Sequence, residues 1–417
     1  DIKVIDPCMG SGHILVYAFD VLMQMYEDAG YSQRDAAKSI LENNLYGLDI
    51  DDRAYQLAYF AVMMKARQYN RRILNGETPC HVYSIQESNN INRAHLKYLG
   101  AGMDELEVNT ARVQLDGLLD TLRDAKEYGS ILKVKNYNWE LLRRFVSAAD
   151  AGEQISMDNA GLEGTVEQLL TLIDTAETMA QKYWVTCTNP PYAVVSKLSD
   201  KVSSFVKQAY PYTKADLFAC FVERGFELTY QYGYLSMITM ESWMFISTFE
   251  EMRTNVIFPH TIMNLVHMPY LGKGGTSLGI NFGTAAFVML NRNQPNFNAQ
   301  YEYTVYYECD DDGVPFVFPT KNQRWKTARK ENFSKIPGSP LSYWVSSEIC
   351  DVYSNSLVKN HMECKSGIMT GDDRYIRLWT EISTTNLKLD CRSADDMGEY
   401  RWFPLNSGGD FRYYYGN

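Results

Sequence analysis

The segment DPCMGSG, residues 6–12, constrains the fold more than any other part of this 417-residue chain. An apolar run at 2–6 precedes it, and a helix-like run from His13 to about Asp28 follows it. A strand that turns through glycines into a helix lets the backbone and its free N–H groups approach a ligand closely. The pattern therefore predicts an α/β fold with a binding site at this turn.

Strand and helix patterns alternate on both sides of a purely helical stretch. Strand-like runs at 44–51 and 80–86 come early in the chain, and runs at 232–239, 261–268 and 283–291 come later. This alternation predicts a parallel sheet with helices on both faces. Four segments follow from it: the first half of the sheet domain at 1–93, a helical insertion at 94–180, the second half of the sheet domain at 181–292, and a loop-rich, aromatic region at 293–417.

Composition narrows the setting of the chain. Eight cysteines without a CxxC pair indicate neither a zinc site nor a disulfide framework, and free thiols are typical of a reducing cytoplasm. No apolar run reaches membrane-spanning length, so we expect no membrane partner. The cysteine spacing leads us to expect no metal partner either. The net charge of −11 argues against a generally basic surface, although the local stretch 321–335 is either a phosphate-binding patch or a solvated loop.

The glycine motif excludes two common cofactor classes. A dinucleotide fingerprint needs a small residue three positions after Gly12, where this chain has Leu15, and needs an acid about 20 residues further on. The second strand instead ends at Asp49, 37 residues after Gly12. No GK[ST] follows the glycines, so a nucleotide triphosphate loop is absent as well. A glycine turn paired with a strand-end acid suits a cofactor without phosphates, and we predict S-adenosylmethionine.

A second motif, NPPY at residues 189–192, directly follows another strand-like run. Two prolines fix the backbone, so the tetrapeptide neither continues a sheet nor begins a helix smoothly. It therefore presents a polar group and an aromatic ring in a stiff arrangement at a strand end. Its alternative interpretation, a plain turn between strand and helix, is weakened by the glycine motif on the same predicted sheet.

With both motifs in this order, the chain resembles the amino-type DNA adenine methyltransferases of the γ arrangement, including BREX-type phage-defence and restriction–modification enzymes. The runs KADLFACFVERGFELT, YGYLSMITMESWMF and GINFGTAAFVML resemble further motifs of that family. The runs SGIMTGDDRYIR and YRWFPLNSGGDFRYYYGN resemble the opening of its target recognition domain. The resemblance implies a Rossmann-like methyltransferase sheet, a helical insertion, and the truncated start of a recognition region at 293–417. It also implies bacterial, DNA-associated enzymes, with double-stranded DNA and other defence-complex subunits as partners.

The resemblance gives the NPPY residues a chemical role. The exocyclic amine of adenine is a weak nucleophile, and the side-chain oxygen of Asn189 and the carbonyl of Pro190 would accept its hydrogens and aim its lone pair at the methyl group. Pro191 would help fix the loop, and Tyr192 would stack on a base that has left the duplex. Phe282 is either a second wall around that base or a core residue at a strand start.

The cofactor contacts implied by the resemblance come from several strand ends. Asp6, Pro7, Gly10 and Gly12 would line its amino-acid end, and Asp49 would accept hydrogen bonds from the ribose hydroxyls.

Three of these assignments have rivals in the sequence. Asp49 is also a candidate helix N-cap, and the ribose and capping roles are open to division among Asp49, Asp51 and Asp52. After the third strand the family usually has Asp, whereas this chain has Gln86 and Glu87, of which we favour Glu87 for the cofactor adenine. Asp216 and Leu217 would close the pocket, and we interpret His13 as a first-turn helix residue rather than a base.

Other functions share parts of this pattern. The NPPY motif also occurs in glutamine methyltransferases that act on release factors and in some RNA methyltransferases, which are usually smaller. An inactive cofactor-binding scaffold in a defence complex is a further alternative, as is a fused nuclease, for which no convincing motif is present. The chain begins with DIKVIDP rather than Met, which predicts a fragment that binds S-adenosylmethionine weakly and methylates DNA poorly. The DNA target sequence cannot be deduced.

Overall fold

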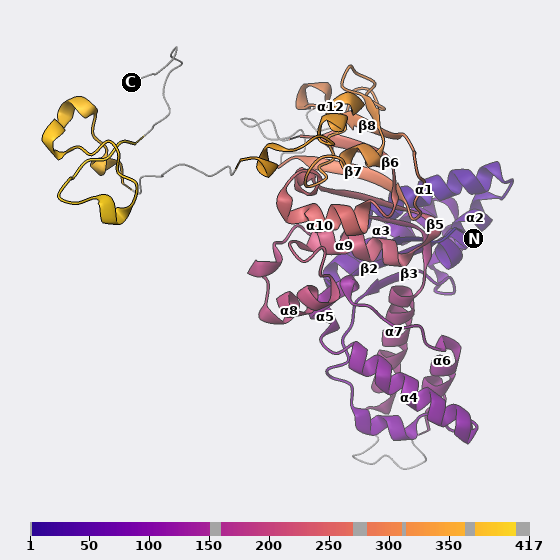
Figure 1. Cartoon of the computed structure of the whole chain (residues 1–417). Helices are drawn as coiled ribbons and strands as arrows, with labels where there is room; N and C mark the ends of the chain where they lie inside the picture. The colour runs from indigo at the N-terminus through magenta and orange to yellow at the C-terminus, as the bar shows by residue number, and fades with distance from the viewer. Residues whose placement is uncertain (1, 151–159, 270–281, 311–313, 363–371, 406–417) are drawn as a thin grey trace. The chain divides into compact units, whose positions relative to one another are not determined.

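A nine-stranded mixed sheet forms the centre of the computed structural model, which describes residues 2–150, 160–269, 282–310, 314–362 and 372–405 (Figure 1). The strands lie in the order β3-β2-β1-β4-β5-β7-β6-β8-β9. Their bounds are β1 Val4–Asp6, β2 Leu45–Asp49, β3 His81–Ser84, β4 Tyr183–Thr188, β5 Thr229–Met240, β6 Thr261–Met268, β7 Thr284–Leu290, β8 Ala299–Tyr303 and β9 Lys326–Ala328.

The first five strands run parallel, as the alternating pattern predicts. β7 is antiparallel to both β5 and β6, while β8 is parallel to β6 and β9 antiparallel to β8. Parallel strands place their carboxyl ends at one edge of a sheet, and ligands bind there in open α/β sheets. The ends of β1, β2 and β4 therefore meet at a single edge.

Alternating side chains on these strands separate two layers of helix. Val4 of β1 packs with α1, α2 and α3 on one face, while the next residue, Ile5, packs with the insertion helices on the other. Figure 1 shows α7 next to β3, with α6 against α7 and α4 against α6, farther from the sheet. The helices on the two faces are α1 His13–Asp28, α2 Gln33–Ser39 and α3 Asp52–Tyr69, and α4 Glu105–Thr121, α5 Ala125–Tyr128, α6 Trp139–Ser147 and α7 Leu162–Ala180.

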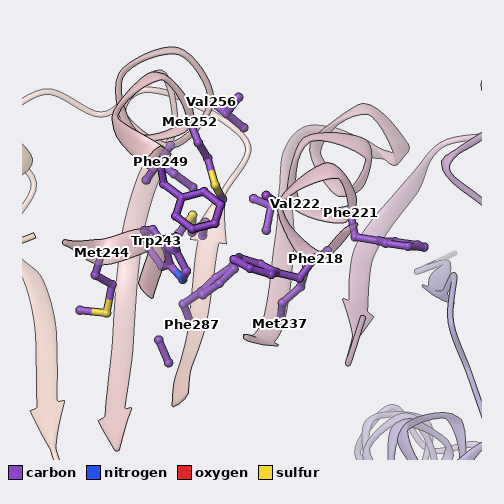
Figure 2. Packing of buried hydrophobic residues seen from close by; sticks show 14 of the residues in the cluster. Phe218, Phe221, Val222, Met237, Trp243, Met244, Phe249, Met252, Val256 and Phe287 are labelled. Atoms are coloured by element: carbon purple, nitrogen blue, oxygen red, sulfur yellow. The ribbon is translucent and has the colours of Figure 1, made fainter. Parts of the chain in front are cut away.

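A third cluster of buried side chains lies between the later strands and α9, Leu217–Leu228. In Figure 2, Phe218 and Val222 of this helix turn toward Phe249 and Phe287, whereas Phe221 points away from them. The remaining helices, α8 Asp200–Ala209, α10 Glu250–Met252, α11 Lys330–Phe333 and α12 Ser347–Val352, are short. Among the described residues, none of the helices is long and apolar enough to cross a membrane.

The sheet extends beyond the boundary expected at residue 292. That boundary falls between β7 and β8, and β8 continues the sheet by pairing with β6 from Asn264 to His267. The first compact unit accordingly runs from Asp1 to Ser354, and a second spans Asn355–Asn417. Within the described part of the second unit the turns are short, and the residues whose burial is described are exposed or half-buried. The loop-rich composition concealed β8 and β9 because these strands have only five and three residues.

Candidate active site

A buried hydrogen bond joins the two strand ends that carry the motifs. β1 and β4 are neighbours, with Ile5 opposite Thr186. Asp6, at the end of β1, is 1% exposed, and its Oδ1 accepts from Thr188 Oγ1 at 2.6 Å and from Cys8 N at 3.0 Å. Thr188 directly precedes Asn189. The glycine loop and the NPPY loop are thus tied together at their bases.

The second carboxylate oxygen of Asp6 is not used in these hydrogen bonds. Asp6 Oδ2 is buried and has no hydrogen-bond partner among the described residues. Burial raises the pKa of the Asp6 carboxyl to about 7, despite the opposing effect of its bond to Thr188. A buried acid with an unused oxygen would be ionised readily once a positive charge lay beside it.

The glycine loop is held by Asp49, at the end of β2. Its Oδ2 accepts from Gly10 N at 2.9 Å and its Oδ1 from Asp51 N at 2.9 Å. Gly10 has a φ of +53° and open space where a Cβ would lie. Gly12 has a φ of +83°, and a Cβ there would approach Cα and Cβ of Ala58 at 2.9 Å. Gly10 therefore leaves room beside the loop, whereas Gly12 lets the start of α1 pack against α3.

The NPPY loop is anchored from the α9 side. The side chain of Asp216, which is buried, caps α9 at Phe218 N and also accepts from Ala193 N at 3.1 Å. Leu217 N donates to the Ala193 carbonyl at 3.0 Å. Burial raises the pKa of Asp216, which is opposed by these backbone donors. Asp216 thus supports the loop that follows Tyr192, and Leu217 is the neighbour that reaches the pocket.

One pocket of about 340 Å³ is lined by both motifs. The strand ends contribute Pro7, Cys8, Asp49, Asn189 and Pro191 to its wall. Apolar side chains of Ile50, Val202, Leu217 and Phe221 complete much of the remainder. A volume in this range fits a small organic ligand. Of the residues that the sequence predicts for the cofactor, Pro7 and Asp49 line this pocket, whereas Asp6, Gly10 and Gly12 are not among its lining residues.

Beside this pocket two aromatic rings stand edge to face. The ring centroids of Tyr192 and Phe282 are 5.4 Å apart, with planes at 70°. Asn189 is exposed, whereas Tyr192 and Phe282 are half-buried. A second contact, 6.3 Å between the centroids of Tyr192 and Phe218, fixes the tyrosine ring against α9. The amide of Asn189, which lines the pocket, therefore lies next to two partly open aromatic rings.

Comparison with known proteins gives this geometry a family. The family described as Eco57I restriction-modification methylase matches residues 43–271, more than half of the chain. The chain belongs to this family. The matched range includes Asp49, the NPPY loop and Asp216, so it covers most of the site described above.

Individual relatives agree with the family. An adenine-specific methyltransferase PglX of Lacticaseibacillus casei (strain Zhang) is 34% identical over 432 residues, which cover 100% of this chain and 35% of the relative. An adenine-specific methyltransferase BrxX of Escherichia coli O9:H4 (strain HS) is 32% identical over 441 residues, with the same coverage. The chain thus spans about a third of the length of these curated relatives. A DrdV–DNA complex covers 83% of this chain at 12% identity and a TM-score of 0.44, and the chain covers 28% of it.

In this member of the family, the insertion contributes a wall that the sequence did not indicate. Residues 127–131, from the end of α5 through the 3-10 turn Gly129–Ile131, line the pocket. Ser130 Oγ donates to the Pro7 carbonyl, and Gly129 packs close to Ile50. The sequence predicts only a helical insertion at 94–180, which gives no signal for this segment. Its glycine, with φ of +63°, was the one local hint of a special position.

The remaining acids lie outside the pocket. Asp51 caps α3 through Arg53 N at 2.7 Å, and Asp52 binds Lys126 at 2.8 Å. Gln86 and Glu87 line a separate hollow of about 380 Å³ together with Lys126. The capping role thus goes to Asp51, and Asp49 is the acid that faces the pocket. Among the described residues no cluster of three or more metal-ligating side chains is present.

The basic stretch 321–335 is largely occupied by contacts within the chain. Arg324 pairs with Glu308, and Lys335 with Asp351 at 2.6 Å. Lys330 Nζ donates to the carbonyls of Phe258 and His260. These ion pairs and backbone contacts support a structural interpretation for most of the stretch.

Proposed function

We propose that this chain carries the catalytic part of a site-specific DNA methyltransferase, which transfers a methyl group from S-adenosylmethionine to the exocyclic amine of a flipped-out adenine. The observation that supports this proposal most strongly is the pocket shared by Asp49 and Asn189, with Asp6 and Thr188 joined beneath it. Double-stranded DNA is the proposed substrate, and other subunits of a phage-defence or restriction–modification complex are proposed partners.

The residues of the pocket fit this cofactor. Asp49 and Glu127 add negative charge at the wall. Next to the lining residues Pro7 and Cys8, Asp6 has a buried carboxylate oxygen without a partner among the described residues, and Gly10 leaves open space. Such a wall suits a cationic ligand that has no phosphates to repel. Each Asp49 oxygen accepts one backbone N–H and keeps a lone pair for a hydroxyl group. When bound, the cofactor supplies a methyl group activated by its positively charged sulfonium.

The NPPY residues would act on the amine. Asn189 Oδ1 and the Pro190 carbonyl would accept its two hydrogens, which turns the nitrogen lone pair toward the incoming methyl group. Because the prolines and the Asp216 contacts fix the loop, these acceptors are placed before the substrate arrives. The rings of Tyr192 and Phe282 would hold the base, which offsets part of the cost of leaving the duplex.

Sequencing that detects methylated adenine tests the proposal. Host DNA from cells with the wild-type protein should carry the mark in one short motif, and the Asn189→Ala variant should lose it, because removing one fixed acceptor slows such reactions about 10²–10³-fold. Asn255→Ala, at an exposed position outside the pocket, is the matched control and should retain the mark.

The location of the transferred label separates this function from its alternatives. Methyl groups from labelled S-adenosylmethionine that appear in protein or RNA, with none in DNA, would contradict the proposal. The inactive-scaffold alternative is favoured if wild-type protein binds the cofactor but leaves every adenine unmarked.

A further inference from the structure

The hydroxyl of Tyr192 lies between two acceptors. Its oxygen is 2.8 Å from Asn189 Oδ1 and 3.0 Å from the carbonyl oxygen of Ile238 on β5. A phenol has one proton to donate. Burial raises the pKa of Tyr192 to about 12, so the hydroxyl keeps that proton at neutral pH. The hydroxyl can donate this proton to only one of the two acceptors at a time, and the contact with Asn189 Oδ1 is the shorter one.

The side chain of Asn189 needs such a partner. An amide presents an acceptor oxygen and a donor NH₂ of nearly the same shape, and turning it by half a rotation exchanges them. Asn189 is exposed, and among the described residues only Tyr192 hydrogen-bonds to its side-chain amide. If the amide turned over, its NH₂ would face the amine hydrogens of adenine, donor against donor. The reaction requires one orientation, and a single contact selects it.

We propose that Tyr192 is a positioning residue as well as a stacking platform: its hydroxyl donates its one proton to Asn189 Oδ1 and so keeps the amide in the orientation that presents this oxygen as an acceptor. This inference rests on the proposed methylation of adenine. It divides the tyrosine into two separable parts, a ring that contacts the base and a hydroxyl that acts only through Asn189. The ring stays anchored without the hydroxyl because Phe282 and Phe218 contact it directly.

Hypoxanthine at the target position tests the orientation without requiring turnover. Hypoxanthine carries an acceptor oxygen where adenine carries its amine, so a fixed Asn189 oxygen should disfavour it. Duplexes with either base in the methylated motif are bound to the intact wild-type protein and to Tyr192→Phe. In Tyr192→Phe the amide is free to turn, and the preference for adenine should fall about 3- to 10-fold, the usual range for one neutral hydrogen bond.

Tyr183→Phe is the matched control. Tyr183 lies on β4, the strand that precedes the NPPY loop, and its buried hydroxyl donates to the Thr178 carbonyl at 2.7 Å, outside the pocket. That variant should retain the wild-type preference between the two duplexes. An unchanged preference in Tyr192→Phe would overturn the inference. Loss of the adenine mark from wild-type DNA altogether would instead show that the proposed function is wrong, since no methylated motif would then exist.

Aspartate at position 189 provides a second measurement. A carboxylate has two equivalent acceptor oxygens, so it has no wrong orientation for a hydroxyl to prevent. Tyr192→Phe should lower kcat about 3- to 10-fold with Asn at position 189, and less than about twofold in the Asn189→Asp background. Equal losses in both backgrounds would assign the hydroxyl a role through Ile238 alone and contradict the proposal.

Discussion

The two sides of the pocket differ in how far the protein satisfies its own polar groups. On the side of the glycine loop, both oxygens of Asp49 and one of the two oxygens of the buried Asp6 accept hydrogen bonds, and Gly12 packs against Ala58. On the side of the NPPY loop, Asn189 is exposed and its amide has a single contact. The first side is therefore part of the fold, whereas the second is completed only by a substrate. Substitutions should affect stability and cofactor binding on the first side, and the reaction or DNA binding on the second.

The largest effect on stability is expected at Gly12. In Gly12→Ala the new Cβ meets Ala58 at 2.9 Å and the φ of +83° strains an L-residue, so the free energy of unfolding should decrease by about 2–5 kcal/mol. Urea unfolding of the purified protein measures the change.

The neighbouring glycine is the control for this substitution. Gly10→Ala meets no atom within 4 Å, so only its backbone strain, about 1–2 kcal/mol, should appear in the unfolding curve. Its Cβ would extend into the open space beside the loop and should weaken cofactor binding in calorimetry. Equal destabilisation by the two substitutions would show that Gly12 is not a packing residue.

A pH-dependent effect is expected at Asp6. Folding raises its pKa to about 7, so the native state favours the protonated carboxyl, and the free energy of unfolding decreases as the pH rises from about 4 to about 7. Asp6→Asn removes this titration while keeping an oxygen for Thr188 and Cys8. The stability of the variant relative to wild type should therefore rise by an amount on the order of 3 kcal/mol between pH 4 and pH 8.

Unfolding curves at several pH values, without cofactor, provide this comparison. Parallel profiles for wild type and variant would mean that the native carboxyl is ionised throughout the range. With cofactor present the difference should shrink, because a cation next to Asp6 favours its charged form.

The glycine-loop side of the pocket was also easier to predict from the sequence than the NPPY-loop side. The bounds of β6 and α1 and the meeting of two strand ends follow from period and spacing in the sequence, because local patterns determine them. Strand β1 begins at Val4, two residues later than the apolar run at 2–6. The role of Gly12 did not follow, since its neighbour Ala58 lies on another helix and only the fold brings them together. Sequence indicates that a glycine is needed, and the packing shows why.

Two further features of the structure differ from the sequence-based predictions because they depend on how distant segments pack. Residues 127–131, which form one wall of the pocket, belong to the helical insertion. The periodic apolar residues of the insertion predict helices that pack, but this short connection has no periodic pattern of its own. Glu87 follows β3 as expected but faces a hollow next to Lys126 rather than the pocket with Asn189. A strand end sets the edge of the sheet at which a residue lies, but the following turn sets where its side chain points.

The smallest effect is expected at Phe282, on the side that the substrate completes. The sequence left two interpretations, a wall for the base or a core residue, and the ring contact with Tyr192 favours the wall. Phe282→Ala should lower the affinity for DNA with an unpaired target adenine about tenfold, since stacking of one base on one ring contributes about 1–3 kcal/mol. Because the side chain is half-buried, the free energy of unfolding should change by less than about 1 kcal/mol. A core residue would give the reverse result, a loss of several kcal/mol in stability with unchanged DNA affinity per folded molecule. Measuring both quantities on one variant therefore decides whether the aromatic surface for the target base is Tyr192 alone or also includes Phe282.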